Sequence, residues 1–170
     1  MSLDSVRAFL ADHAPDLVIL ELLESTATVA LAAVGHGVEP AQIAKTLALR
    51  VAEKALLLVT SGEARLDNQK AKACFGGKVK MLPGDEVASL TGHPVGGVCP
   101  FGLATTLPVY CDISLQAFQE VLLAAGSTRS ALRISPTRMV ELTKAAWVDV
   151  CQTFPRTMPT EQSVPYTGRR

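Results

Sequence analysis

A glycine- and proline-rich stretch, 92-GHPVGGVCPFGL-103, is the first place in this chain where the residue types suggest chemistry. Gly96 and Gly97 can adopt backbone angles closed to other residues, so that nearby amides can point into a concavity that binds a carbonyl oxygen or a phosphate. Pro100 would stiffen the far side of the loop. Apolar residues of the same stretch would wall a small pocket: Val98, Cys99 and Phe101. The alternative is a glycine-rich connection packed under a sheet.

A lysine in the segment 42-QIAKTLAL-49 is the second candidate. Lys45 lies at the junction between a predicted helical turn and an apolar strand, a position from which its ammonium group could project from a rigid frame into a cleft. A lysine at a strand end is more often simply solvated. Together with an amide-lined loop, Lys45 would form a site for an anion and a carbonyl group that neither element forms alone.

The motifs of several other enzyme classes are missing. The chain has no G-x-x-x-x-G-K-[ST] or G-x-G-x-x-G nucleotide loop and no H-E-x-x-H helix. Its four cysteines form no C-x-x-C pair, so a zinc site is poorly supported. His93 lies six residues before Cys99, but this spacing within a loop is not a recognised nucleophile arrangement. A small side chain lining a pocket is the favoured interpretation of Cys99.

Charge is balanced overall but unevenly distributed. The chain has 16 basic and 16 acidic residues, and this zero net charge argues against a protein that wraps long nucleic acid. Residues 45–80 nevertheless hold eight basic residues and three acidic ones. This segment predicts either a local positive face that could meet phosphate or lysines that only solvate strands and a helix.

Length and composition predict one compact domain that is soluble and cytoplasmic. The 170 residues, 48% of them hydrophobic, suffice for a substantial core. The apolar runs are far shorter than the roughly 18 to 20 residues that cross a bilayer, and the N-terminus lacks a signal-peptide pattern. We assign the domain to residues 1–152 and expect residues 153–170, which include three prolines, to form a loose tail.

Hydrophobic periodicity predicts short helices interleaved with short strands. Helices are expected after Ser2 or Asp4, over 29–34, 68–75 and 85–90, and after Ser135; strands are expected over 17–23, 47–51, 55–60, 79–82, 108–113, 131–134 and 147–150. The segment 115–125 has helical spacing, although 121–123 could be a strand. Because no regular βαβ rhythm is visible, we predict an irregular α+β domain and not a doubly wound sheet.

End signals refine these boundaries. Thr28 and Asp67 are the expected N-caps of two helices, and Gly35 and Gly76 are their expected ends. The chain is expected to break at Lys45, just before a hairpin formed by the strands at 47–51 and 55–60.

Four segments, in this order, resemble the YbaK/ProX family of aminoacyl-tRNA editing domains. They are QIAKTLAL at 42–49, ARLDNQKAKACFGGKVKML at 64–82, TGHPVGGVCPFGL at 91–103 and LPVYCDISL at 107–115. The resemblance covers most of residues 15–150. Each segment alone is a weak signal, but a Lys-Thr pair before a strand with a G-x-x-P loop further on is fairly specific in this order.

The resemblance implies a fold and an activity. The fold would be α+β, with a mixed, mostly antiparallel, barrel-like sheet surrounded by short helices and a strand near 121–125. The activity would be that of a freestanding trans-editing hydrolase, which deacylates mischarged tRNA of the Ala- or Cys-tRNA(Pro) class without metal or cofactor. The expected partners are the acceptor end of the mischarged tRNA and, as a second candidate, prolyl-tRNA synthetase.

The family's lysine maps onto Lys45 and its glycine-proline loop onto 97–100, so we expect Lys45 and Gly97 to be the catalytic residues. Lys45 would orient the tRNA end, and amides near Gly97 would bind the ester carbonyl while water attacks it. The other expected substrate-binding residues are Thr46, Gly96, Val98, Cys99, Pro100, Phe101 and Ser130. Ser130 lies in a region where some relatives place a pocket-lining acid, and Cys99 lies where a serine is common.

Two alternatives to an enzyme stay open at this level. The chain could be a non-catalytic module of the same fold that binds tRNA or a synthetase, or a relative that binds a small molecule and no RNA. Alanine and cysteine both stay candidate substrates, because an apolar pocket discriminates a methylene or a sulfur by only about 1 to 3 kcal/mol.

Overall fold

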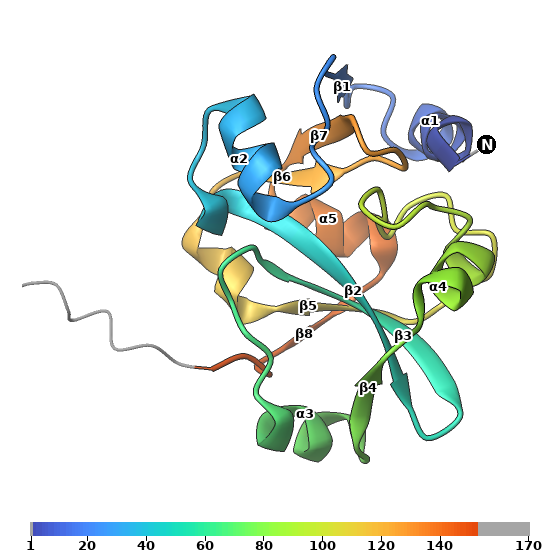
Figure 1. The fold of residues 1–170 in the computed structure, drawn as a ribbon, viewed down its shortest axis with the longest axis vertical. Coiled ribbons are helices and arrows are strands. Elements are labelled where there is room, and N and C mark those ends of the chain that lie inside the picture. The colour runs from blue at the N-terminus through green and yellow to red at the C-terminus, as the bar shows by residue number, and fades with distance from the viewer. Residues whose placement is uncertain (1, 153–170) are drawn as a thin grey trace, which may run out of the picture.

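The computed structural model describes residues 2–152, in which eight strands form one mixed sheet and five α-helices lie around it (Figure 1). In chain order the elements are α1 (Ser2–His13), β1 (Ile19–Glu21), α2 (Val29–His36), the 3₁₀ turn η1 (Pro40–Gln42), β2 (Ile43–Val51), β3 (Lys54–Ser61), α3 (Asn68–Phe75), β4 (Val79–Met81), α4 (Gly84–Thr91), β5 (Val109–Asp112), the 3₁₀ turn η2 (Ile113–Ala117), β6 (Val121–Ala124), β7 (Ser130–Ile134), α5 (Pro136–Thr143) and β8 (Ala146–Val148). The α+β class expected from the sequence is confirmed.

The strand order is β1-β7-β6-β2-β3-β5-β8, and β4 joins the sheet by pairing with β2. Four pairs are antiparallel (β1 with β7, β2 with β3, β2 with β4, β6 with β7), and three are parallel (β2 with β6, β3 with β5, β5 with β8). The long hairpin of β2 and β3 runs through the middle of the molecule (Figure 1). It is therefore the frame to which both halves of the sheet attach.

Local capping signals fix several helix ends as expected. The Asp67 side chain accepts hydrogen bonds from two amides of the first turn of α3, and Gly76 ends that helix in the left-handed conformation. The Thr28 side chain caps α2 by accepting a hydrogen bond from the Leu31 amide. The end of α2 differs from the expectation, because the helix continues past Gly35 to His36 and the left-handed cap is Gly37.

Two other expectations need correction, and strand pairing is the reason in both cases. No break occurs at Lys45, since β2 begins at Ile43 and pairs without interruption with β3. The first strand covers only residues 19–21, the part that pairs with β7. The ambiguous segment 115–125 divides into η2 and β6, in agreement with the strand implied by the family resemblance. The expected tail, 153–170, lies outside the described residues.

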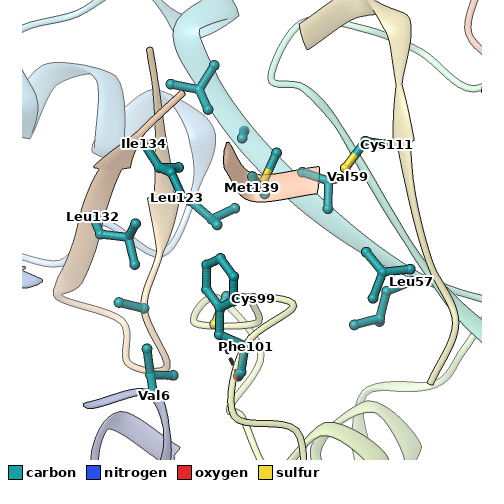
Figure 2. Close-up of a cluster of buried hydrophobic side chains, with 14 of the residues drawn as sticks. Val6, Leu57, Val59, Cys99, Phe101, Cys111, Leu123, Leu132, Ile134 and Met139 are labelled. Carbon is teal, nitrogen blue, oxygen red and sulfur yellow. Dashed lines mark hydrogen bonds between the residues drawn. The ribbon is translucent and has the colours of Figure 1, made fainter. Parts of the chain in front are cut away.

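The main hydrophobic core lies on one face of the sheet and includes side chains from strands, helices α1 and α5, and the glycine-rich loop. Figure 2 shows Phe101 and Cys99 from the loop among Leu123, Leu132 and Met139. A smaller core on the opposite face joins the β2–β3 hairpin to α3, and a third joins α2 to Ile43 and Leu122. The loop is thus an integral part of the core, which explains why so many of its residues are apolar.

Helices within residues 2–152 are too short or too polar to cross a bilayer.

Candidate functional site

A gap in the sheet defines the candidate site. One edge of β2 pairs with β6 through residues 43–44 and with β4 through residues 49–51. Between these two partners, residues 45–47 pair with no described strand on that edge. A cavity of about 360 Å³ lies at this gap, within the usual range for small-molecule pockets. Its walls come from α2, β2, the ends of β6 and β7, the segment 26–29, residues 81–87 and the glycine-rich loop.

Lys45 lines this cavity from within β2. Its Nζ atom donates hydrogen bonds to the carbonyl oxygens of Gly62, at 3.2 Å, and Ala64, at 2.8 Å. Partial burial lowers the pKa of the Lys45 ammonium group; the nearby Cys151 sulfur opposes this shift and the Arg65 charge adds to it. The two carbonyl groups therefore hold the ammonium in place, while one of its three N–H bonds is left for another acceptor.

Thr46, the next residue, also lines the cavity. Because successive side chains of a strand point to opposite faces, Thr46 lies on the face of Ala44 and Ala48, and Lys45 lies on the other. The Thr46 hydroxyl is buried and has no hydrogen-bond partner within the described part of the chain. A buried hydroxyl without a partner is unusual in a folded protein and calls for an explanation.

Two close contacts account for the glycine pair of the loop. Gly96 has a φ of +90°, and a Cβ atom there would lie 2.8 Å from the Cβ atom of Ala27. A Cβ atom on Gly97 would lie 2.7 to 2.8 Å from main-chain atoms of Ser127. Side chains at either position would therefore push apart the three segments that meet at this end of the cavity.

The Gly97 peptide group is already engaged within the protein. Its amide donates to the Pro94 carbonyl at 2.9 Å, closing a turn with the left-handed Gly96 at its third position, as in a type II turn. Its carbonyl accepts from the Gly126 amide at 3.0 Å. The neighbouring amides of Gly96 and Val98 make no hydrogen bond to any residue within 2–152. Because Gly96 and Val98 line the cavity, their amides are two loop donors available to a ligand.

The structure places some of the expected site residues in the cavity lining and others outside it, in the protein interior. Lys45, Thr46, Gly96, Val98 and Ser130 line the cavity. The other four expected residues lie outside the lining and are buried: Gly97, Cys99, Pro100 and Phe101. Cys99 and Phe101 are fully buried in the main core (Figure 2).

A hydrogen-bonded cluster inside the loop explains the placement of Cys99. The buried His93 ring donates through Nε2 to the Phe101 carbonyl at 2.8 Å, and the Cys99 thiol lies 3.7 Å from the same nitrogen. Burial raises the pKa of the Cys99 thiol to about 12. A thiol that stays protonated and has no access to the cavity is unsuited to be a nucleophile. His93 and Cys99 therefore anchor the loop.

Sequence reasoning missed His36. Residues Val29, Ala32 and His36 form one stripe of α2 along the cavity, at a spacing of three and four residues that could have been read from the sequence. The His36 Nε2 atom is buried and has no partner within residues 2–152. Burial, and then the charge of Arg133, lower the pKa of His36, so the neutral ring is favoured.

The polar character of the cavity is set by donors. Its lining residues include Lys45 and four residues with hydroxyl groups (Thr26, Thr28, Thr46 and Ser130), but no residue of the described chain with a carboxylate. The Ser130 hydroxyl accepts a hydrogen bond from Ser127 at 2.7 Å and keeps its own proton for another acceptor. No group of three or more His, Cys, Asp or Glu side chains in the described region is arranged to hold a metal ion. The arrangement fits a ligand rich in oxygen acceptors.

Comparison with known proteins assigns the chain to a class. Residues 24–142 match the family model for the aminoacyl-tRNA editing domain. The chain therefore belongs to the aminoacyl-tRNA editing domain family, and the resemblance seen in the sequence is confirmed.

Individual relatives include both short proteins and synthetases. The uncharacterized protein YwhH of Bacillus subtilis is 42% identical over 154 residues, which span 89% of this chain and 98% of YwhH. A crystal structure described as "a putative trans-editing enzyme for prolyl tRNA synthetase" has a TM-score of 0.83 and 36% identity, and the match covers 89% of this chain and 98% of that one. The proline–tRNA ligase of Citrifermentans bemidjiense is 30% identical over 98 residues, which span 57% of this chain and 17% of the ligase.

Proposed function

We propose that this protein is a trans-editing hydrolase that removes alanine or cysteine from mischarged tRNA(Pro). The single observation that carries the proposal is that Lys45 and the glycine-rich loop line the same cavity. Membership of the editing-domain family supports this activity. The match of YwhH along nearly its whole length supports action in trans, separate from the synthetase.

The cavity suits an ester of the tRNA terminal adenosine. Its apolar walls accept a small side chain, and its donors match the oxygen atoms of the ester, the ribose and the terminal phosphate. Lys45, with one N–H left free by its two carbonyl partners, would orient the negatively charged tRNA end. This role uses the ammonium group for binding and positioning.

The ester carbonyl would bind to loop amides. Because the Gly97 amide already donates to Pro94, we assign the donors to its neighbours Val98 and Gly96. One such donor is typically worth about 3 to 4 kcal/mol in the transition state. Gly97 would contribute by permitting the close approach to Ser127 that fixes the direction of these amides.

Water would attack the carbonyl carbon, since the buried thiol of Cys99 is unsuited to form an acyl intermediate. The ribose 2′-hydroxyl of the terminal adenosine is the proposed acceptor of the proton lost by water, and it would give its own proton to the departing ribose oxygen. Replacement of this hydroxyl by hydrogen should abolish most of the turnover, and full hydrolysis of the 2′-deoxy substrate would exclude this proton path.

A panel of mischarged tRNAs tests the proposed function. Alanyl-, cysteinyl- and seryl-tRNA(Pro) are incubated with the pure protein, with prolyl-tRNA(Pro) as the matched control. We expect release of alanine or cysteine faster than the spontaneous rate and no release of proline. Binding of these tRNAs without turnover of any ester would instead favour a non-catalytic tRNA-binding module of the same fold.

A further inference from the structure

On the open edge of β2, the main-chain N–H and C=O groups of one cavity-lining residue, Thr46, have no strand partner. In a strand, the N–H and C=O groups of one residue point to the same side, and those of successive residues alternate. The Ala48 carbonyl accepts a hydrogen bond from the Leu82 amide at 3.0 Å, so Ala48 faces the edge on which β4 pairs. Thr46, two residues earlier, faces the same edge, at the gap where neither β4 nor β6 reaches.

The side chain of the same residue adds a second polar group. Four buried side-chain polar atoms within residues 2–152 lack a hydrogen-bond partner: His36 Nε2, Thr46 Oγ1, Arg50 Nε and His93 Nδ1. Two of these four, on His36 and Thr46, belong to residues that line the cavity. Thr46 thus combines main-chain groups without a strand partner and a buried hydroxyl group without a hydrogen-bond partner. This combination indicates that a ligand forms the missing hydrogen bonds of both.

The charged side chains around the cavity determine which kind of ligand atom Thr46 can bind. An ammonium group would need carboxylate or carbonyl partners, and no Asp or Glu of the described chain lines the cavity. The preceding residue, Lys45, carries a positive charge instead, on an Nζ atom that the Gly62 and Ala64 carbonyl groups hold on the other face of β2. A cationic ligand group is therefore disfavoured here, while an oxygen that gains negative charge is stabilised.

We propose that Thr46 is a catalytic residue that completes the oxyanion site of the loop amides: its main-chain N–H and hydroxyl groups donate hydrogen bonds to the same ester carbonyl oxygen as it becomes an oxyanion. This inference rests on the deacylase function proposed above. The oxygen of water forms a bond to the carbonyl carbon, and the electron pair of the C=O double bond moves to the carbonyl oxygen that Thr46 binds. The electron pair on the carbonyl oxygen then re-forms the C=O double bond, and the bond from the carbonyl carbon to the ribose oxygen breaks. The proton lost by water ends on the ribose oxygen by way of the 2′-hydroxyl group.

The substitution Thr46→Val tests the hydroxyl at nearly constant volume. We expect kcat for the mischarged ester to fall about 100-fold with KM nearly unchanged, since the donor acts in the transition state. The melting temperature should stay the same or rise, because the variant removes a buried hydroxyl that has no protein partner. Thr46→Ser, which keeps the hydroxyl, should retain most of the kcat.

A matched control is available in α5. The Thr143 hydroxyl donates to the Met139 carbonyl at 2.7 Å, and the residue does not line the cavity. Thr143→Val makes the same chemical change and should leave kcat at the wild-type value. A Thr46→Val protein with wild-type kcat, or one whose kcat loss is matched by Thr143→Val, would overturn the assignment.

A binding measurement separates this inference from the proposed function. An adenosine 3′-(1-aminoethyl)phosphonate imitates the tetrahedral intermediate, and 3′-alanylamido-3′-deoxyadenosine imitates the ground state. Thr46→Val should weaken binding of the phosphonate at least 10-fold and leave binding of the amide nearly unchanged. If the wild type hydrolyses no ester but this difference is found, the deacylase function fails and the oxyanion site stands. Equal affinities of both proteins for the phosphonate would refute the role of Thr46, whatever the turnover.

Discussion

The α-carbon of Gly97 lies so close to the main chain of Ser127 that a methyl group on it would approach the Ser127 carbonyl carbon to 2.7 Å. The two segments are also joined by the hydrogen bond from the Gly126 amide to the Gly97 carbonyl. This contact ties the glycine-rich loop to the turn before β7, and so fixes the position of the cavity-lining residues Gly96 and Val98.

Gly97→Ala should therefore damage both stability and activity. Main-chain atoms have to move to admit the methyl group, and such overpacking typically costs about 1 to 3 kcal/mol in the free energy of unfolding. Urea denaturation and the deacylation assay measure the two effects. Gly77→Ala is the matched control, because its nearest neighbour is a side-chain methyl of Val51 at 3.2 Å. Equal unfolding free energies for the two variants would contradict the structural reason given for Gly97.

Lys45→Met should impair deacylation with little effect on the fold. The substitution removes one hydrogen bond from a charged group to the substrate, worth about 1.5 to 3 kcal/mol, so kcat/KM should fall about 10- to 150-fold. The lost contacts to Gly62 and Ala64 are offset in part by removal of a partly buried charge, whose cost is seen in the lowered pKa of Lys45. Lys80→Met on the exposed strand β4 makes the same change of charge away from the cavity lining. Unchanged turnover in Lys45→Met would remove this residue from the mechanism.

The free energy of unfolding should decrease as the pH falls from neutral into the acid range. Burial lowers the pKa of His93 from 6.5, although its hydrogen bond with Phe101 opposes the shift, and burial lowers the pKa of His36 as well. The unfolded chain therefore binds protons at a higher pH than the native one, so stability is lost as the pH falls through 6.5 toward the lowered native values. Urea denaturation at pH 7.5 and 5.5 measures the slope.

The variant His93→Gln separates the contribution of the loop histidine to the acid sensitivity from that of His36. The amide nitrogen of glutamine can keep the hydrogen bond to the Phe101 carbonyl without a titratable ring. Between pH 7.5 and 5.5, this variant should lose less unfolding free energy than the wild type. The double variant His93→Gln/His36→Gln should lose even less. An unchanged slope in the double variant would show that other groups control the acid sensitivity.

Alkylation of the native protein should modify Cys74 and spare the other three cysteines. Cys74 is exposed, whereas Cys99, Cys111 and Cys151 are buried and burial raises the pKa of each thiol to about 12. Iodoacetamide at neutral pH followed by mass spectrometry reads out the modified sites. Deacylation should survive the treatment, and Cys74→Ser should prevent labelling. Rapid labelling of Cys99 with loss of activity would restore it as a candidate nucleophile.

Much of the local structure follows from short stretches of sequence. Asp67 and Gly76 mark both ends of α3 because an N-cap side chain and a left-handed glycine act within one helical turn. The hairpin of β2 and β3 follows from two apolar strands close together in the chain. The segments that resemble editing domains likewise define the family without any knowledge of the fold. These features depend on neighbours in sequence, so the sequence by itself determines them.

Tertiary structure decided the shape of the site. The gap at Thr46 exists because β6 and β4, distant in sequence, pair with two parts of the same edge of β2. Val98 and Cys99 are adjacent in the loop, yet Val98 lines the cavity and Cys99 lies in the core. Their placement depends on how the loop packs against the segments around Ala27 and Ser127. The Gly97 carbonyl is engaged by the Gly126 amide because the turn before β7 packs against the loop. Such contacts reflect packing between remote segments, and residue types and spacing do not encode them one by one.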